Sequence, residues 1–264
     1  MRNIVIKITT IMKSNIYILF LLVIIISCKT NNDSPPTAEY IVNKAIEVSG
    51  KDAFKHSNVS FTFRNKKYTS EGHCNHYIYS RVSRKPDTLI KDFYEPGKSF
   101  KRYINDSLFQ VADTTAQKYA ESINSVHYFV QLPYRLNDKA VNKTYIGLDT
   151  IKNKTYHQLQ VTFDQKGGGT DFQDVYMYWF GKKDYKLDYL AYSFVVNGGG
   201  IRFREAYNER YIDSIRFVDY RNYKPKLDDI KLQNISKAFN NNQLELLSKI
   251  ENKKIQVEKS KEKC

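Results

Sequence analysis

Apolar and polar residues alternate along most of the chain beyond Gly50, which is the pattern of β-strands with one buried face. Val59, Phe61 and Phe63, for example, are separated by polar side chains. The later strands are joined by only about two to eight residues, whereas parallel neighbours need crossovers of about a dozen. The pattern therefore predicts an antiparallel meander. Strands are expected near residues 77–79, 89–94, 100–111, 144–150, 154–164, 173–181, 186–196, 201–209 and 212–221.

Two segments show the helical period instead. Residues 38–49 form a predicted helix, with Thr37 as its N-cap and Gly50 as the residue that ends it. Residues 114–131 form a second predicted helix, which stops just before Pro133. Helices therefore interrupt the meander at least twice.

The last part of the chain is less regular. Residues 227–239 have a pattern that a helix can satisfy, and 244–257 are interpreted as a final strand with an irregularity near Asn252. A helix is the alternative for that last segment. Taken together, the elements predict an α+β, mainly antiparallel β fold. They form a single β-rich domain at 38–258, followed by a charged tail at 259–264.

The N-terminal segment has the features of a targeting signal. Residues 16–26 are uniformly apolar, and 1–27 contain three basic residues and no acidic one. Eleven residues in a helix span about 16 Å, roughly half of a bilayer core, so they predict a signal peptide rather than a membrane span. The Ser27-Cys28 pair has the pattern of a bacterial lipobox, which predicts cleavage before Cys28 and acylation of its thiol and amino groups. Residues 28–37 are the expected tether between the lipid and the domain. The alternatives to a lipoprotein are a protein with an uncleaved membrane helix and a soluble secreted protein.

Composition narrows the class of protein. The 264 residues include 42 basic and 28 acidic side chains, for a formal net charge of +14, and removal of three basic residues with 1–27 leaves about +11. An apolar content of 41% excludes a disordered chain, and 3 cysteines exclude a disulfide-dense scaffold. An exported protein does not meet nucleic acid, and the basic residues are dispersed. We therefore expect a solvated basic face, or attraction to anionic lipid headgroups.

Two neighbouring predicted strands are apolar on both faces. In 174–180 (DVYMYWF) the alternate residues of either phase are apolar, and 186–196 repeats the feature. One face can pack against helices, and the other is either covered by more protein or lines a concave surface. Tyrosine suits a concave surface because its ring accepts an apolar ligand and its hydroxyl a polar group. The candidate ligand-binding side chains are Tyr176, Tyr178, Phe180, Tyr192 and Phe194, with a filled core as the alternative.

Two triple-glycine loops, at 167–169 and 198–200, are expected to be hairpin turns, with close backbone approach to a ligand as the alternative. In a meander, alternate turns fall on the same edge, so both loops should share one rim. Arg204 and Glu205 follow the second loop on opposite faces of one strand, so one of them points to the concave side. Both are candidate ligand-binding residues. A buried contact of Arg204 with Asp174 or Asp188 is one possibility, and surface placement is the other.

Motifs of known chemistry are weak or missing. The chain has neither a G-x-S-x-G elbow nor an H-E-x-x-H pair, and no catalytic residue or cofactor is expected. The His73-Cys74-Asn75-His76 stretch has metal-capable groups but no distant partner pair, so no metal site is predicted. His127 and His157 lie among aromatic residues and are expected in the core or at its boundary.

Several segments resemble a family of uncharacterised Bacteroidota lipoproteins over residues 38–258. They are AEYIVNKAI, VSFTFR, NSVHYFVQLPYRLND, VTFDQKGGGTDF and GGGIRFREAY. The resemblance implies a LolA-like half-barrel, an antiparallel sheet curled around helices with a hydrophobic cleft between them, and implies no catalytic residues. Lys29 after Cys28 resembles default sorting to the outer membrane, facing the periplasm. Some members carry the label deoxyribose-phosphate aldolase. Such aldolases use a Schiff-base lysine in a barrel of parallel strands, and the hairpin connections predicted here argue against a parallel barrel.

The sequence thus favours a lipid-anchored cell-envelope protein that binds an apolar or amphipathic molecule, such as an acyl chain, in a cleft of a curved sheet. An envelope interaction or structural protein that binds glycan or a protein partner is the alternative. A hydrolase or lyase is the third, and it needs two titratable groups within hydrogen-bond reach inside a pocket.

Overall fold

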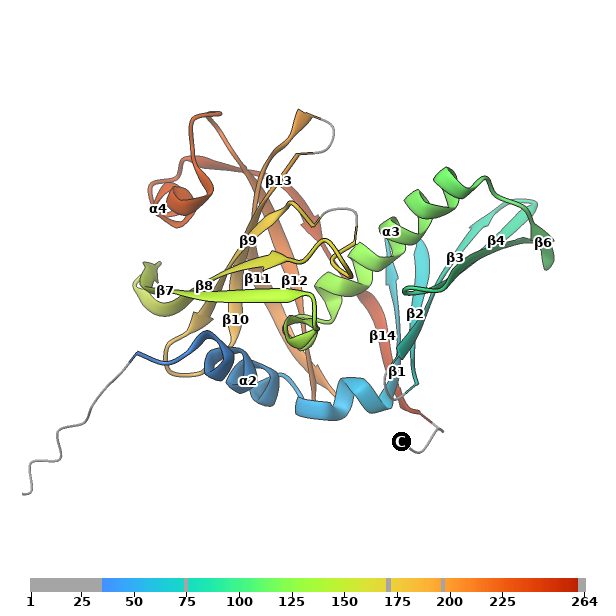
Figure 1. The fold of residues 1–264 in the computed structure, drawn as a ribbon, viewed down its shortest axis with the longest axis horizontal. Helices are drawn as coiled ribbons and strands as arrows, with labels where there is room; N and C mark the ends of the chain where they lie inside the picture. Colours follow the sequence, from blue (N-terminus) through green and yellow to red (C-terminus); the bar gives the residue numbers. More distant parts are fainter. Residues whose placement is uncertain (1–34, 74–75, 170–171, 196–197, 261–264) are drawn as a thin grey trace, which may run out of the picture. The chain divides into compact units, whose positions relative to one another are not determined.

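Two antiparallel sheets of seven strands each, with short helices, make up the described part of the chain (Figure 1). The structure is a computed structural model that describes residues 35–73, 76–169, 172–195 and 198–260. The predicted signal peptide, Cys28 and most of the tether lie outside the described residues, as do 261–264 of the predicted tail.

The N-terminal sheet has the strand order β14-β1-β2-β3-β4-β5-β6, and every neighbouring pair is antiparallel. At the β5–β6 turn, Asn105 and Asp106 both have positive φ, which matches the twist of a two-residue hairpin. The expected strand at 100–111 is therefore two strands. The bounds are β1 Ser57–Phe63, β2 Lys66–His73, β3 His76–Lys85, β4 Thr88–Glu95, β5 Ser99–Ile104, β6 Ser107–Phe109 and β14 Lys253–Lys259.

The C-terminal sheet has the order β13-β12-β11-β10-β9-β8-β7, again with antiparallel neighbours throughout. The meander predicted for this half of the chain is confirmed. The order also places the β8–β9 and β10–β11 turns, which carry the two glycine loops, on one edge of the sheet. The bounds are β7 Val141–Ile151, β8 Lys154–Phe163, β9 Val175–Gly181, β10 Leu187–Phe194, β11 Gly200–Ile212, β12 Ile215–Pro225 and β13 Leu244–Ile250.

The C-terminal segment joins the two sheets. β13 pairs with β12 in the C-terminal sheet, and β14 pairs with β1 in the N-terminal sheet. The irregularity expected near Asn252 is the point at which the chain passes from one sheet to the other. The backbone N–H of Asn252 donates to Asp219 Oδ1 at 2.9 Å, which fixes the crossing. The single curved sheet expected from sequence is thus two open sheets, and the mainly antiparallel α+β class is confirmed.

Helices fill the space beside the sheets. Thr37 accepts a hydrogen bond from Tyr40 N at 3.1 Å as the N-cap of α2, and Gly50 ends that segment with a φ of 118°, as expected. The helix expected at 227–239 is shorter in the structure. Only its last part, from Leu232 onward, is helical, and Leu227 is exposed. The bounds are α2 Ala38–Val48, η2 Lys51–His56, α3 Asp113–Val130, η3 Tyr134–Asn137, η5 Leu232–Asn234 and α4 Ile235–Asn240.

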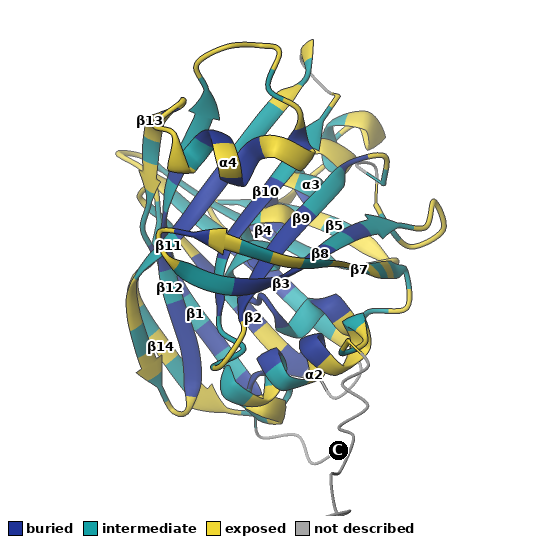
Figure 2. Cartoon of the chain, turned by 90° about the vertical axis from the view of Figure 1, so that its left-hand side faces the viewer, coloured by how far each residue is buried: buried dark blue, intermediate teal, exposed yellow. Residues whose placement is uncertain are grey.

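The central strands β9 and β10 are buried on both faces, as their two-sided apolar pattern requires (Figure 2). On one face Tyr178 and Leu190 pack in a cluster with α2 and η3. On the opposite face Trp179 and Tyr189 pack against η5 and α4. Helices therefore cover both faces at the middle of the sheet, and two clefts lie near the strand ends beside α3.

Candidate functional site: clefts on both sides of helix α3

Helix α3 stands between the two sheets (Figure 1). Its first half is held by the N-terminal sheet: the guanidinium of Arg102 lies 3.8 Å from the centre of the Tyr119 ring, and Arg81 Nη1 donates to Ser122 Oγ at 3.2 Å. Polar and aromatic groups thus help to dock the helix, in addition to its buried residues Ala120, Ile123 and His127.

The last turns of α3 contact the C-terminal sheet. The hydroxyls of Tyr128 and Tyr178 share a hydrogen bond at 2.8 Å. The Phe129 ring packs beside Tyr176 and Tyr192, with centroid separations of 6.5 and 5.7 Å. Because consecutive residues of a helix point about 100° apart, Tyr128 and Phe129 contact different parts of the same sheet.

A cleft of about 720 Å³ opens on one side of α3, and we call it the Arg204 cleft. Its volume lies within the range of small-molecule sites, about 300–1,000 Å³. Its walls come from both sheets and from α3. The side chains that matter below are Phe129, Tyr176, Tyr192, Phe194, Arg202 and Arg204.

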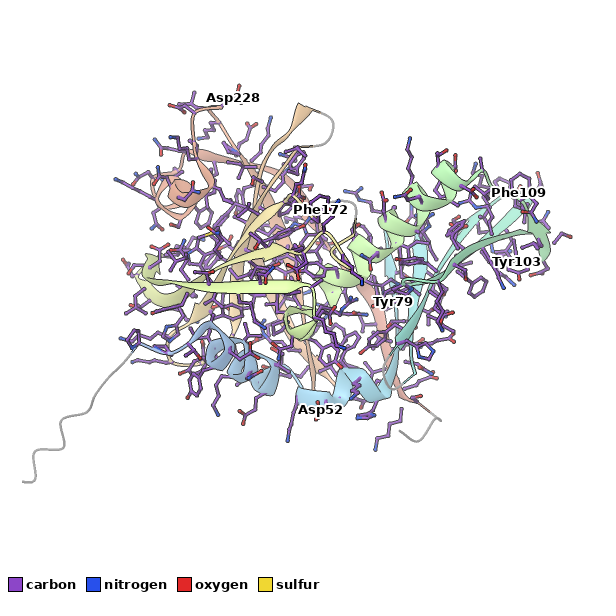
Figure 3. All side chains as sticks on the ribbon, viewed as in Figure 1. Asp52, Tyr79, Tyr103, Phe109, Phe172 and Asp228 are labelled. Carbon is purple, nitrogen blue, oxygen red and sulfur yellow. The ribbon has the colours of Figure 1, made fainter. Side chains whose placement is uncertain are left out.

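A second cleft, of about 850 Å³, lies on the other side of α3, and we call it the glycine-loop cleft. Its wall includes Gly167, Gly168 and Gly169, from the loop that carries Phe172 (Figure 3). A side chain at Gly168 would place its Cβ 2.2 Å from the backbone oxygen of Asp164, so only glycine fits there. Gly167 and Gly169 have positive φ values of 93° and 82°, which glycine adopts without strain, and the backbone of this loop also borders the cleft.

The two clefts share three lining residues, Ser125, Phe129 and Tyr176. Burial is the main cause that raises the pKa of the Tyr176 hydroxyl, and the neighbouring Tyr128 and Asp174 raise it further. The hydroxyl is therefore neutral at ordinary pH and is available as a hydrogen-bonding group. The shared wall is thus aromatic, with polar atoms at its rim.

Arg204 is the most buried basic side chain that lines the Arg204 cleft. It is 8% exposed, its Nη2 donates to the Tyr192 hydroxyl at 3.0 Å, and its guanidinium lies 3.8 Å from the centre of the Phe129 ring. Its strand β11 places it opposite Leu190 and Asn222 in the ladder, on the face that looks toward α3.

The structure separates the residues predicted to bind ligand. Tyr176, Tyr192, Phe194 and Arg204 line the Arg204 cleft. Tyr178 and Phe180 share their face but are fully buried in the core. The residues predicted from sequence to bind ligand therefore fall into two groups, one that lines the cleft and one that lies in the core.

Glu205 points to the opposite face of β11 from Arg204, as expected. Its carboxylate accepts hydrogen bonds from Lys152 Nζ at 2.6 Å and from the Tyr223 hydroxyl at 3.1 Å, away from both clefts. The suggested contact of Arg204 with Asp188 is absent from the described residues, because Asp188 binds Lys154 at 2.7 Å and contacts Arg216 at 3.3 Å. Asp174, the other suggested contact, lines the same cleft as Arg204.

Sequence reasoning missed the contribution of α3 to the site. The sequence pattern predicts a helix at Ser125 and Phe129 but indicates no contact of either residue with a ligand. The adjacent aromatic pair Tyr128-Phe129 was the available signal, because two neighbouring aromatic residues on a helix cannot both occupy one narrow apolar stripe.

Within the described ranges, no three His, Cys, Asp or Glu side chains gather closely enough to hold a metal ion. His76 Nε2 lies 3.7 Å from Glu95 Oε1, and Cys74 is outside the described residues. A helix both long and apolar enough to cross a membrane is likewise absent from the part of the chain that the structure describes.

Residues 14–252 match a family of unknown function, DUF6503, so the chain belongs to that family. The predicted membership of an uncharacterised family is thereby confirmed. No curated protein is significantly similar to the chain in sequence.

Several solved structures are similar to this chain, among them the following three. A DUF1329 family protein from Desulfovibrio piger has 10% sequence identity and a TM-score of 0.48, with 85% of this chain and 94% of that chain covered. A LolA superfamily protein from Nitrosomonas europaea has 11% identity and a TM-score of 0.42, with 85% and 94% covered. A Vibrio parahaemolyticus domain described as an outer membrane lipoprotein-sorting protein has 7% identity and a TM-score of 0.41, with 82% and 93% covered.

Proposed function

We propose that this protein binds an apolar or amphipathic molecule, such as an acyl chain, in the clefts beside α3. The observation that carries the proposal is the position of α3 between two open sheets, with a cleft on each side and a shared aromatic wall at Phe129 and Tyr176. Aromatic rings bury a large apolar area, and tyrosine hydroxyls at the rim remain available to a polar group.

The shape of the site favours a ligand over a flat interaction surface. An interaction protein that binds glycan or a partner through its aromatic residues would present them on an open sheet. Here Tyr176 and Phe194 lie within a recess whose volume suits a small molecule. A chain-like ligand could lie along either side of Phe129.

The proposal places the protein at the cell envelope, anchored by lipid on Cys28 and facing the periplasm at the outer membrane. It rests on the lipobox pattern at 25–28 and the polar tether that follows. A tethered binding domain would collect its ligand at or near the membrane surface.

A bulky substitution at Ser125 tests the proposal, because this side chain lines both clefts. We expect full-length wild-type protein extracted from its native membrane to carry a co-purifying amphipathic molecule in native mass spectrometry. Ser125→Trp should reduce that bound fraction roughly tenfold or more, since an indole would occupy the space beside Phe129.

Lys118→Trp is the matched control, because Lys118 lies on the same helix and is exposed outside both clefts. It should retain the ligand at the wild-type level. A wild-type protein that emerges empty, or a Ser125→Trp variant that binds as well as Lys118→Trp, would contradict the proposal.

A further inference from the structure

Arg204 is a buried charge whose hydrogen-bonding capacity is mostly unused. Among the described residues its guanidinium makes one hydrogen bond, from Nη2 to the Tyr192 hydroxyl at 3.0 Å, and its Nε has no partner. A guanidinium carries five N–H donors. The rings of Phe129 and Tyr192, at 3.8 and 5.3 Å from the guanidinium carbon, attract the cation but accept no strong hydrogen bond.

The other arginines of comparable burial have carboxylate partners. Arg81 is 6% exposed and contacts Asp92 at 2.7 Å, and Arg216 is 7% exposed and contacts Asp188 at 3.3 Å. Arg204, at 8% exposed, has no carboxylate within ion-pair distance in the described part of the chain. A buried charge is costly unless it is paired, so a counter-ion from outside the chain would satisfy this one.

The surroundings of Arg204 favour an anion with an apolar tail. Arg64, Lys66 and Arg202 line the same cleft, against one acidic lining residue, Asp174. The remaining wall includes the apolar side chains Phe63, Val126, Phe129, Val130 and Ile250. Positive charge and aromatic or aliphatic surface thus meet within one recess of about 720 Å³.

A second unsatisfied group lies next to Arg204 in the sheet. Asn222 pairs with Arg204 in the β11–β12 ladder, is 8% exposed, and has a side-chain oxygen without a hydrogen-bond partner among the described residues. Its Nδ2 donates to Ser248 Oγ at 3.3 Å, which orients the oxygen. A donor that suits an anionic oxygen and an acceptor that suits a hydroxyl or a water molecule are therefore both left over on neighbouring strands.

We infer that Arg204 binds the acidic headgroup of an amphipathic anion, a carboxylate or a phosphate, whose chain lies along Phe129 and the apolar wall of the Arg204 cleft. Arginine suits this role because its planar fork binds both oxyanions in a bidentate manner. The inference rests on the proposed function and adds the charge and position of the headgroup.

The test compares amphiphiles that share a chain and differ in headgroup. The full-length protein is offered an equimolar mixture of hexadecanoate, hexadecyl phosphate and hexadecanol, and the bound species are counted by native mass spectrometry. We expect the two anions to be bound about ten- to a hundredfold more than the alcohol, as charge-assisted hydrogen bonds predict.

Two variants of Arg204 separate charge from structure. Arg204→Met should remove the preference for anions while hexadecanol still binds, and Arg204→Lys should retain only part of the preference because it keeps the positive charge but loses the bidentate fork. Circular dichroism of each variant shows whether the fold is intact. An Arg204→Met variant that has lost binding of all three ligands but keeps its fold would assign Arg204 a structural role and overturn the inference.

The outcomes distinguish this inference from the proposed function. Equal binding of anions and alcohol by the wild type would refute the headgroup site and leave the apolar cleft in place. Failure to bind any of the three would refute both. Inorganic phosphate alone forms a separate arm: if it protects the wild type but not Arg204→Met against thermal unfolding, while none of the amphiphiles binds, the site takes a free oxyanion and the amphipathic ligand is wrong.

Discussion

His127 is the most completely buried titratable side chain on α3. It is 0% exposed, its ring stacks on Tyr79 with centroids 4.3 Å apart, and the edges of Phe61 and Tyr68 complete the surroundings at 5.6 and 5.8 Å. Tyr79 lies on the inner face of the N-terminal sheet (Figure 3). Burial in this aromatic cage lowers the pKa of His127 to about 3, so the imidazole is neutral in the native state.

This pKa predicts how stability depends on pH. The unfolded chain takes up a proton at His127 near pH 6.5 and the native chain only near pH 3. The stabilisation is therefore complete above about pH 6.5 and is lost progressively as the pH falls toward 3, at up to about 1.4 kcal/mol per pH unit. Urea unfolding at a series of pH values should show His127→Phe with a flatter acid limb than wild type.

His56→Gln is the control for that series, because His56 is exposed and is not part of the cage. Its acid limb should follow that of the wild type. If His127→Phe kept the full wild-type slope between pH 6.5 and 4, the histidine would not be the group that sets it.

At the scale of elements, α3 is docked on the N-terminal sheet by a buried charge network. Asp92 on β4 is 1% exposed and accepts hydrogen bonds from Arg81 on β3 at 2.7 Å and from Arg102 on β5 at 2.7 Å. The two arginines then contact α3 through Ser122 and Tyr119. One carboxylate thus holds two cations in the orientation that positions the helix and both clefts.

Removal of that carboxylate should loosen α3. Asp92→Ala leaves two arginines without their shared counter-ion, and we expect the free energy of unfolding to fall by about 3–5 kcal/mol. Asp106→Asn, which removes the charge of the exposed Lys91–Asp106 pair at 2.6 Å and suits the positive φ of this turn position, should cost less than about 1 kcal/mol. Denaturant titration of both variants measures the difference, and equal losses would contradict the docking role.

Element-level patterns could be predicted from the sequence where local physics sets them. Thr37 and Gly50 mark the ends of α2, and the two-sided apolar pattern of 174–180 identifies a strand covered on both faces. The pattern could not separate Tyr176, which lines the clefts, from Tyr178, which is in the core, because alternation tells which face a residue occupies and not how far along it the covering helices extend.

At the scale of the whole molecule, the partners of strands and charges depend on long-range register, which the sequence pattern does not specify. The pattern indicated an irregularity near Asn252 but not that β13 and β14 belong to different sheets. The unpaired state of Arg204 was equally hidden, since it depends on where Asp188 lies after β9 and β10 have paired. The alternation of side chains along a β-strand predicted only that Arg204 and Glu205 lie on opposite faces of the sheet.

The C-terminal strand makes the two sheets one folding unit. Ile255 and Val257 of β14 pack in a cluster that combines Phe61 of the N-terminal sheet with Ile215 and Phe217 of the C-terminal sheet. Since β14 also pairs with β1 along its length, this strand cannot detach without exposing apolar surface of both sheets. Unfolding is therefore expected to be a single cooperative transition.

A charge on the inner face of β14 tests that coupling. Ile255→Asp places a carboxylate in the shared cluster, and we expect the free energy of unfolding to fall by about 2–4 kcal/mol with the tyrosine fluorescence of both sheets lost together. Gln256→Asp introduces the same group one residue further along, on the exposed face, and should change stability by less than about 0.5 kcal/mol. Ile255→Asp could instead unfold the N-terminal sheet alone, while bound ligand still protects the C-terminal sheet against unfolding as in the wild type. In that case the two sheets would be independent folding units. The clefts between them would then not require a fixed arrangement of both walls.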